Sequence, residues 1–453
     1  HAFLWNYENQ DIALATNGTE RLAVTSEGIT VTGEVSASQD YPNFRPTLDF
    51  NFAATKKLDP RITYQRSGPA SFTDEFGKVI LVGDNVPRFD HDPDTRECKG
   101  LLIEESRTNI APYSNDLSQY GGHNFTSTAN DAVAPDGTTT ATKIEHGGSG
   151  TSYLDYIDNS INAAGAGTYT YSVWLKAPDD QPDGYYGCRI ALLHSTGGNV
   201  EPTISLNKTW TRYSVTKTFG ASDPGKLRVH LVMFRANPGD TYGGKVIPSY
   251  VWAWGAQIEA GAFPTSYIPT AGATRGYEAV TLEGTDFSDA FGTEFKEFSL
   301  VADYDNTQTD DGTNYGIIDL WGESTGYDDR IEWFKDDASP YHIETRAFGQ
   351  GNALFNNGEL SASSKAKSQR FATSWFVPDY SNTSSRRFVV SMGGEAVDII
   401  PDNTGSTVPQ ITRMGIGCNP TRLDFKPGLL HFKRLMVYNK TLSDGQLQNL
   451  SAQ

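Results

Sequence analysis

The sequence predicts an all-β protein in which tandem β-sandwiches follow a short N-terminal β segment. Aromatic residues make up 12% of the 453 residues, beside 44 glycines and 22 prolines. This composition is typical of short strands joined by tight turns around thin, aromatic-rich cores. Apolar residues also alternate with polar ones in run after run, and turn residues separate the runs, as in sandwich and jelly-roll proteins.

The overall charge restricts the partners that we expect. The formal net charge is −18, and a surface this acidic repels phosphate groups, so neither nucleic acid nor an anionic membrane is an expected partner. The longest apolar runs, such as Val79–Val82, are far too short to span a bilayer. We therefore expect no membrane insertion, and the sequence also predicts no signal peptide.

The cysteines indicate neither a disulfide framework nor a zinc site. Cys98, Cys188 and Cys418 are odd in number, far apart and without a CxxC spacing. We interpret them as partly buried free thiols, which favours folding in a reducing compartment. No cofactor and no metal are predicted.

Residues 1–40 are predicted to form a β segment that promotes oligomer formation. In residues 20–35, Leu22 and Val24 alternate with polar residues, as do Ile29 and Val31, around a turn at Gly28. A hairpin this small buries too little surface to be stable alone in water. We therefore expect it to pack against another chain.

Residues 41–110 are interpreted as a connector rich in proline. Within it, residues 72–83 predict a hairpin with its turn at Gly77. Its last part, residues 85–109, contains six carboxylates, three arginines, a histidine and a cysteine. Either an active site, a metal site or a structural element held by charge pairs would account for this density.

The structural interpretation is the one that the local sequence favours. Pro93 follows Asp92 and biases it away from helix, and Asp-Pro-Asp is a turn sequence rather than a rigid ligand platform. We therefore expect a structural strap in which arginines pair with carboxylates, Arg96 being within reach as well. The residues assigned to this strap are Arg88, Asp90, Asp92, Glu104, Glu105 and Arg107.

Residues 111–270 are predicted to form the first sandwich, of jelly-roll type. The clearest strand covers residues 167–177, where Val173 and Leu175 face one way and Trp174 faces the other. Turn signals recur between this strand and its neighbours. Three strand tryptophans, Trp174, Trp252 and Trp254, are interpreted as core residues.

Residues 271–278 are interpreted as a linker of small residues, and residues 279–453 as a second sandwich. The sequence predicts one helix at its end, over residues 443–450. Ser443 and Gln446 have the spacing of a capping box, Leu442 and Leu447 that of a hydrophobic staple, and Asp444 suits the first turn.

Catalytic motifs are not recognisable. Adjacent acids such as Asp179-Asp180 point to opposite faces of a strand and cannot act together across a sugar. No GxSxG, Walker or HExxH motif occurs. Residues 306–314 contain enough oxygen ligands to raise the alternative of a bound calcium, but without a full ligand spacing.

One cluster is compatible with sugar binding. A flat ring beside polar side chains is what sugar sites in β-sandwiches use. Residues 324–334 supply such a set, although a core tryptophan beside a solvated turn would give the same pattern. The residues of this glycan-site hypothesis are Tyr327, Asp328, Asp329, Arg330 and Trp333.

Several long stretches together resemble a group of bacteriophage tail-fibre and related virion proteins. The stretches are residues 58–79, 85–118, 134–144, 169–177, 254–270 and 430–450. The resemblance covers nearly the whole chain. It implies a fibre-shaft segment at the N-terminus, a jelly roll similar to carbohydrate-binding modules, and a concanavalin A-like (laminin-G-like) lectin sandwich. It also implies that the strap is a structural connector.

The function that this resemblance implies is that of a virion structural protein, such as a tail fibre, that contributes to attachment to host-surface glycans. Expected partners are two further copies in a homotrimer, other virion proteins and bacterial surface polysaccharide. The expected location is the virion, assembled in host cytoplasm and acting at the host surface. A purely architectural decoration, collar or baseplate component is the alternative. We predict no enzymatic activity, with a capsule depolymerase as a third hypothesis.

Overall fold

The structure is a computed structural model of the chain. It describes all residues except 1–11, 17–18, 26–27, 32–41, 148–154, 163–165, 195–199, 201, 221–225, 235–237, 270–271, 307–313, 324–328, 336–342, 351, 360–367, 379–384, 404–406, 418–425, 428 and 453. Strands dominate the described residues, so the predicted all-β class with multiple sandwich sheets is confirmed. The chain divides into two compact units, residues 1–45 and residues 46–453.

The first unit contains a three-stranded antiparallel sheet of β1 (Ile12–Thr16), β2 (Thr19–Thr25) and β3 (Gly28–Val31). In the β2–β3 pair, Leu22 lies opposite Val31 and Val24 opposite Ile29. These are the residues whose alternation predicts a hairpin here. Ala23 is buried, whereas Val24 is 39% exposed.

The second unit contains the larger sandwich, built from two eight-stranded sheets. The strands of the first sheet are β29 (Asn352–Glu359), β28 (Ile343–Gly349), β27 (Arg330–Lys335), β26 (Tyr315–Trp321), β33 (Arg413–Ile416), β24 (Ala279–Glu283) and β5 (Thr63–Gln65) in this order, with β34 (Lys426–Pro427) beside β26. Those of the second are β32 (Asp398–Ile399), β31 (Arg387–Met392), β30 (Ser368–Phe376), β25 (Glu297–Asn306), β35 (Leu430–Tyr438), β9 (Cys98–Ile103) and β8 (Phe89–His91), with β4 (Leu48–Asn51) also beside β35.

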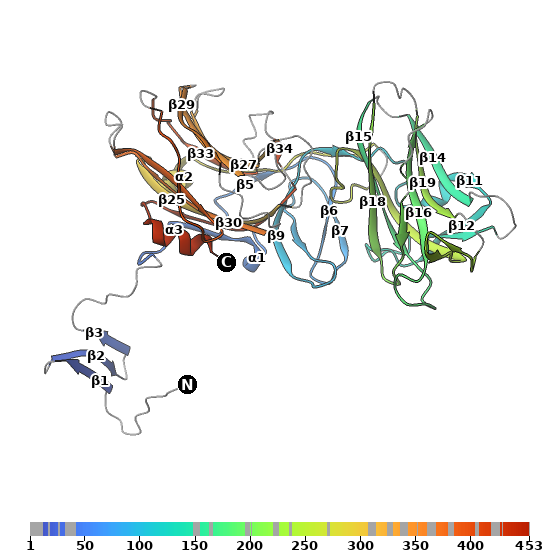
Figure 1. Ribbon diagram of the computed structural model, residues 1–453, viewed down its shortest axis with the longest axis horizontal. Helices are drawn as coiled ribbons and strands as arrows, with labels where there is room; N and C mark the ends of the chain where they lie inside the picture. The colour runs from blue at the N-terminus through green and yellow to red at the C-terminus, as the bar shows by residue number, and fades with distance from the viewer. Residues whose placement is uncertain are drawn as a thin grey trace. The chain divides into compact units, whose positions relative to one another are not determined.

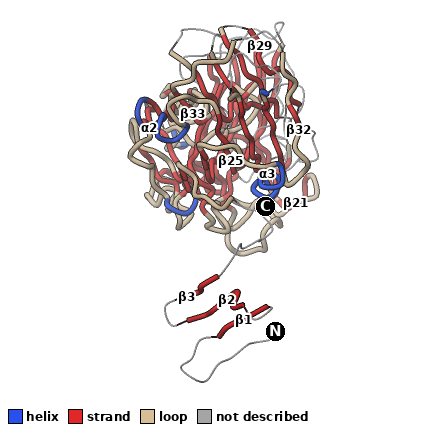
Figure 2. Tube along the Cα trace, turned by 90° about the vertical axis from the view of Figure 1, so that its left-hand side faces the viewer, coloured by secondary structure: helices blue, strands red, loops and turns tan. Residues whose placement is uncertain are grey.

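The face-to-face sheets bury one continuous apolar core. It contains stacked aromatic rings from both sheets, among them Trp333 of β27 and Phe371 of β30, whose centroids lie 6.1 Å apart. Three short helices complete the described part of this sandwich. They are α1 (Phe52–Thr55), α2 (Gly284–Phe291) and α3 (Asp444–Ser451). Figure 2 shows α2 and α3 at the periphery of the strands.

Helix α3 begins where the capping box predicts a helix. The Ser443 side chain accepts from the Gln446 N–H at 3.3 Å, and the Gln446 side chain accepts from the Ser443 N–H at 3.0 Å. These two bonds satisfy orphan N–H groups of the first turn. Leu447 is fully buried, so the helix is held by its apolar face as well as by its cap.

The predicted boundaries of the connector need correction. β4, β5, β8 and β9 all lie within residues 41–110, yet they are strands of the larger sandwich. β35 pairs with both β4 and β9, and β24 pairs with β5. Figure 1 shows β9 and α1, in shades of blue, against the orange strands from the end of the chain. The larger sandwich is therefore assembled from two separate parts of the sequence.

The smaller sandwich is inserted between those two parts, in residues that the sequence analysis assigns to a jelly roll. One five-stranded sheet has the order β11 (Gly121–His123), β14 (Asp155–Asn162), β19 (Lys226–Phe234), β16 (Gly187–His194) and β17 (Thr203–Ser205). The other has the order β12 (Phe125–Ala132), β13 (Ala141–His146), β22 (Tyr250–Ala260), β15 (Gly167–Lys176) and β18 (Thr211–Phe219). The short elements η1 (Leu117–Gln119), β20 (Thr241–Tyr242) and β21 (Lys245–Val246) accompany them.

The chain passes from the larger sandwich into the inserted one, and back again, through a two-stranded ribbon. β10 (Arg107–Thr108) pairs with β23 (Thr274–Arg275), and Arg107 lies directly opposite Arg275. Gly68 approaches this ribbon so closely that an added Cβ would lie 1.9 Å from the Thr274 carbonyl oxygen. We call this region, where the chain enters and leaves the inserted sandwich, the junction.

A hairpin bridges the two sandwiches at the junction. It consists of β6 (Ala70–Thr73) and β7 (Val79–Val82), with the turn at Gly77 that the sequence predicts. The Val79 N–H donates to the Pro135 carbonyl of the inserted sandwich at 3.0 Å. The Val79 side chain packs with Trp254 and Tyr267. On the other side, the Thr73 N–H donates to Asp90 of β8 in the larger sandwich at 2.7 Å, so the hairpin is held on both sides.

Candidate ligand-binding cleft

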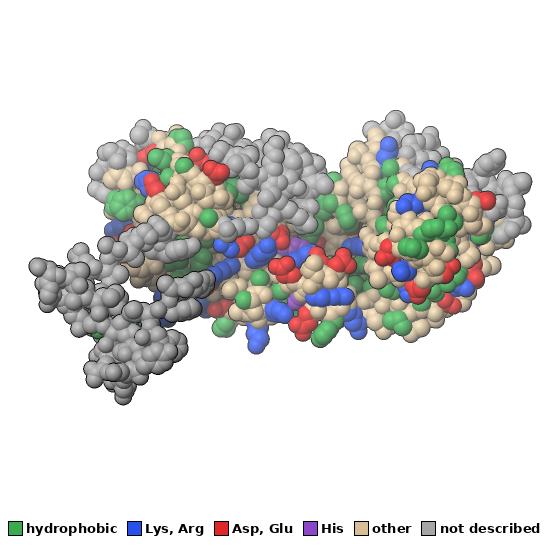
Figure 3. All heavy atoms as spheres, turned by 60° about the horizontal axis from the view of Figure 1, so that its bottom comes forward, with side chains coloured by type: hydrophobic (Ala, Val, Ile, Leu, Met, Phe, Trp, Pro, Cys, Tyr) green, Lys and Arg blue, Asp and Glu red, His purple; other side chains and the backbone are tan. Residues whose placement is uncertain are grey.

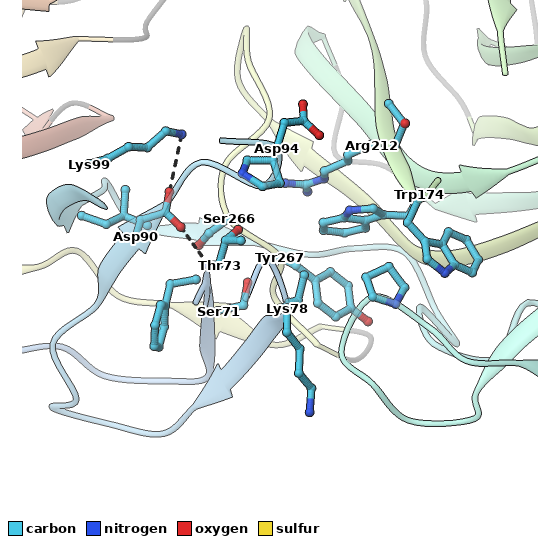
Figure 4. Close-up of a pocket in the computed structure, with 18 of the residues that line it drawn as sticks. Ser71, Thr73, Lys78, Asp90, Asp94, Lys99, Trp174, Arg212, Ser266 and Tyr267 are labelled. Carbon is cyan, nitrogen blue, oxygen red and sulfur yellow. Dashed lines mark hydrogen bonds and ion pairs between the residues drawn. The ribbon is translucent and has the colours of Figure 1, made fainter. Parts of the chain in front are cut away.

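A cleft of about 840 Å³ lies at the junction. Its walls come from the β6–β7 hairpin, the turn between β8 and β9, the inserted sandwich, and β35 of the larger sandwich. Figure 4 shows Asp90 and Lys99 on one side and Trp174 and Arg212 on the other. We call it the junction cleft. Its volume is within the range typical of small-molecule sites.

Buried ion pairs lie next to the junction cleft, which one of their members, Glu104, lines. Arg88 lies between two carboxylates, 2.7 Å from Glu104 and 2.5 Å from Glu278. Arg275 lies 3.1 Å from Glu104, and Arg66 lies 3.3 Å from Glu278. All five side chains are 0% exposed. We call these five residues the junction cluster.

Further hydrogen bonds connect the junction cluster to the inserted sandwich. The Ser266 hydroxyl donates to Glu104 at 2.6 Å, and Arg88 donates to the Ser266 oxygen, also at 2.6 Å. The Ser266 N–H donates to Glu104 as well. Buried charges are tolerated only where hydrogen bonds satisfy them, and this set meets that requirement for both carboxylates.

The pKa values of Glu104 and Glu278 are shifted in opposite directions, although both carboxylates lie beside Arg88. Burial alone would raise the pKa of Glu104, but the charges of Arg275 and Arg88 and the bonds from Ser266 lower it to about 2. Burial raises the pKa of Glu278 above its ordinary value, with Arg88 and Arg275 opposing the rise. Glu104 is therefore the carboxylate that stays ionised in acid.

A second polar group lies on the wall formed by the larger sandwich. Nε2 of His431 lies 2.8 Å from a carboxylate oxygen of Asp90, and Lys99 lies 3.7 Å from the same oxygen. Burial would raise the pKa of Asp90, but the hydrogen bond and charge of His431 and the charge of Lys99 hold it below its usual range. Within the described residues no group hydrogen-bonds Nδ1 of His431, so no hydroxyl there completes a nucleophile–base pair with this histidine.

The opposite wall presents an aromatic ring and a cation from adjacent strands. Trp174 of β15 and Arg212 of β18 are cross-strand partners, and the Arg212 guanidinium lies 4.4 Å from the centroid of the Trp174 ring. Trp254 and Tyr267 pack against the same ring, with centroids 5.4 Å and 5.7 Å away. Trp174 is half-buried, so one part of it packs and another part faces the cleft.

Two more aromatic side chains line the junction cleft. Trp210 is half-buried, with its indole N–H donating to the Val133 carbonyl at 2.9 Å. Phe76, at the tip of the β6–β7 hairpin, is 77% exposed. Large exposed rings beside a concave site are typical of ligand-binding surfaces.

Figure 3 shows one face of the molecule on which acidic and basic side chains gather close together.

The residues assigned to the strap are found in four places. Arg88 and Glu104 belong to the junction cluster, and Glu105 pairs with Arg107, whose guanidinium lies over the Phe263 ring at 5.0 Å. Asp90 pairs with His431 rather than with an arginine. Asp92 accepts backbone N–H groups of Asp94 and Thr95 at 2.9 Å, which makes it a turn residue.

The three described residues of the glycan-site hypothesis are not brought together at a surface. Trp333 is 0% exposed within the core, and Arg330 is 4% exposed and donates to Glu332. Asp329 accepts from the Gln350 N–H, and Tyr327 and Asp328 lie outside the described residues. The burial of Trp333 contradicts its proposed role in stacking on a sugar. The cause is that β27 lies inside its sheet and faces the opposite sheet.

Trp174 and Trp252 also differ from their interpretation as core residues. Both are half-buried, whereas Trp254 is 1% exposed. The alternation along residues 167–177 does place Trp174 on the face opposite Val173 and Leu175, and this signal distinguishes it from the core. Arg212 carried no such signal, because its position beside Trp174 depends on which strands pair.

Metal ligation has no clear position in the described part of the chain, where no group of three or more His, Cys, Asp or Glu residues could hold an ion. Residues 307–313, the centre of the calcium alternative, lie outside the described residues. None of the described helices has the length and apolar character of a membrane span.

Comparisons with known proteins found similarity to solved structures at low identity and low TM-score. No protein-family model matches the chain, and no curated protein matches its sequence. Among solved structures, the CBM40 of the Ruminococcus gnavus IT-sialidase bound to α2,3-sialyllactose is 12% identical, with a TM-score of 0.27, over 35% of this chain and 83% of that one. Trypanosoma rangeli sialidase is 11% identical, with a TM-score of 0.28, over 72% of this chain and 52% of that one.

These matches require one correction. Besides binding domains they include two Trypanosoma rangeli structures. A sialidase with a covalent intermediate is 14% identical, with a TM-score of 0.29, over 38% of this chain and 26% of that one. A variant with trans-sialidase activity is 11% identical, with a TM-score of 0.28, over 39% of this chain and 27% of that one. The prediction that this chain is not an enzyme is contradicted by them.

Proposed function

We propose that the chain binds glycans in the junction cleft. The observation that supports this proposal most strongly is the half-buried ring of Trp174, which lies in a concave surface beside polar groups on other elements. Sugars are bound by stacking of their C–H faces on aromatic rings and by hydrogen bonds to their hydroxyls. The cleft lining offers both kinds of contact.

The polar groups surround the ring from several elements. Lys99 and Asp94 lie near the turn between β8 and β9, and Thr209 lies beside Trp210. Within the described residues the Trp174 indole N–H has no hydrogen-bond acceptor, so it remains available to a ligand hydroxyl. A rigid ring with a free donor suits a sugar better than it suits a purely apolar ligand.

The experiment compares two tryptophans of the same sheet. Trp174→Ala removes the ring in the cleft, whereas Trp252→Ala removes a half-buried ring outside it, whose N–H donates to Asp131. The protein and both variants are applied to an array of bacterial surface polysaccharides. Binding that is lost in Trp174→Ala and retained in Trp252→Ala supports the proposal. Absence of binding to every polysaccharide, or equal loss in both variants, would overturn it.

We also propose that the protein is a virion appendage, such as a tail fibre, that attaches to host-surface glycan as a homotrimer. The support is the sequence resemblance to bacteriophage fibre proteins and the small three-stranded β-sheet of residues 12–31, which belongs to a separate compact unit. A purely architectural role in the virion is the alternative. Sizing of the full chain tests the homotrimer: a mass near three times 49.6 kDa supports it, and a monomer contradicts it.

A further inference from the structure

We propose that the glycan bound in the junction cleft is acidic, and that Arg212 binds its anionic group. This inference rests on the proposed function and adds the chemical class of the ligand. The group is a carboxylate or an equivalent oxyanion on a sugar. The argument depends on the hydrogen bonds of Arg212, on the charges around it and on its position against Trp174.

Arg212 has donors to spare. Its Nη1 donates to the Thr265 carbonyl at 2.6 Å, and its Nη2 donates to the Ser172 hydroxyl at 2.8 Å. The Nε–H is buried and has no partner. A guanidinium has five N–H donors in a planar fork, so neutral acceptors occupy only part of this group. A fork with unused donors is the geometry that recognises carboxylate.

The acids near Arg212 act on it through their charge and not through a direct ion pair. Among the described residues no carboxylate forms an ion pair with it. The two acids whose charges act on Arg212 have other hydrogen-bond donors: Glu259 accepts from Gln257 and Thr265, and Glu104 belongs to the junction cluster. Burial lowers the pKa of Arg212 to about 10, with Glu259 and Glu104 opposing this change. At neutral pH the side chain is a cation in the wall of a cleft, with no direct ion pair to a described residue.

Two further cations in the lining of the cleft strengthen this positive character. Lys78 and Arg96 both line it, and neither forms an ion pair with a described residue. Of the three lining acids, Asp90 and Glu104 are paired, which leaves Asp94. A surplus of free cations here contrasts with a chain of net charge −18. Local cations of this kind raise the concentration of anionic ligands near the cleft.

The position against Trp174 favours an anionic sugar over a small inorganic anion. The guanidinium lies over the same ring that the glycan is proposed to contact. An anionic substituent at Arg212 would place the rest of its sugar beside Trp174. A free phosphate would use the charge and leave the aromatic wall without a contact.

The test measures binding to acidic polysaccharides and to the same polymers after chemical reduction of their carboxyl groups. The probes are printed uronic-acid-containing bacterial polysaccharides, each beside its carboxyl-reduced form. We expect the acidic form to bind about tenfold tighter, as a charged hydrogen bond implies. Arg212→Gln should abolish this preference, and Arg212→Lys should retain part of it. Arg61→Gln is the matched control, because Arg61 lies over the Phe50 ring but pairs with Asp59 outside the cleft.

Each outcome decides between the two proposals. A preference for the acidic forms that is lost in Arg212→Gln and kept in Arg61→Gln supports the inference. Equal Trp174-dependent binding to acidic and reduced forms overturns the inference and leaves glycan binding intact. An acid preference that survives in a folded Arg212→Gln protein also overturns the role of Arg212. Absence of binding to both forms overturns both proposals.

Discussion

Arg88 and Glu278 form an ion pair across the junction, with Nη2 of Arg88 2.5 Å from Oε1 of Glu278, although 190 positions separate them in the chain. The entire inserted sandwich lies between them in sequence. The pair therefore closes the chain where it leaves and rejoins the larger sandwich. The junction cleft is built directly on this closure, since Glu104 of the same cluster lines it.

Loss of Arg88 is predicted to destabilise the protein strongly. Arg88→Met removes a cation that two buried carboxylates share, and breaking a buried pair in this way costs about 3–5 kcal/mol. Lys56→Met is the control, because the Lys56–Glu75 pair is exposed and such pairs contribute about 1 kcal/mol or less. Urea unfolding at pH 7 measures both. Equal midpoints for the two variants would contradict the structural role of the junction cluster.

Stability is predicted to fall in acid because of Glu104. Its pKa is about 2 in the folded protein, against 4.5 as the ordinary value. Because folding lowers the pKa of Glu104, its ionised carboxylate stabilises the folded protein. This contribution is fully present above pH 4.5 and is lost as the pH falls toward 2. The difference corresponds to about 3 kcal/mol. Urea midpoints of the wild type and Glu104→Gln at pH 7 and pH 3 measure it. The variant should be less stable at pH 7 and lose less between the two pH values, and a parallel loss in both proteins would contradict the assignment.

The local sequence pattern predicted the fold class but not the insertion. Alternation and turn residues identify strands such as residues 167–177 and the turn at Gly77. They do not predict that β4 pairs with β35. Next to this pair, the Thr47 hydroxyl donates to the Val437 carbonyl, 390 positions away in the chain. Pairing at such distances depends on tertiary packing. The same limit hid the site, because Trp174 and Arg212 become neighbours only through the β15–β18 pairing.

Gly255 is predicted to hold Trp174 in position. Its φ is +68°, and an added Cβ would lie 2.7 Å from Cε3 of Trp174. Gly255→Ala should therefore displace the ring, and should lose about 1 kcal/mol or more of stability from the left-handed backbone. Gly239→Ala is the control, because Gly239 has a φ of +89° but open space around it. Both variants should be less stable, and only Gly255→Ala should change the near-ultraviolet circular dichroism of tryptophan and weaken glycan binding. Unchanged binding in Gly255→Ala would contradict this role.

The capping box of α3 is predicted to contribute about 1 kcal/mol. Ser443→Ala removes the side-chain oxygen that accepts from the Gln446 N–H. Ser288→Ala in α2 serves as the comparison, because Ser288 is half-buried, lies inside its helix and does not cap it. Its effect should stay within about 0.5 kcal/mol. Thermal unfolding of both variants measures the difference, and equal transition temperatures would contradict the contribution of the cap.

A crystal structure of the full chain with an acidic oligosaccharide released from a polysaccharide that it binds tests the central claim most directly. We predict a sugar ring in contact with Trp174 and its acidic group hydrogen-bonded to Arg212. A sugar bound anywhere else on the protein, with the junction cleft empty, would contradict it.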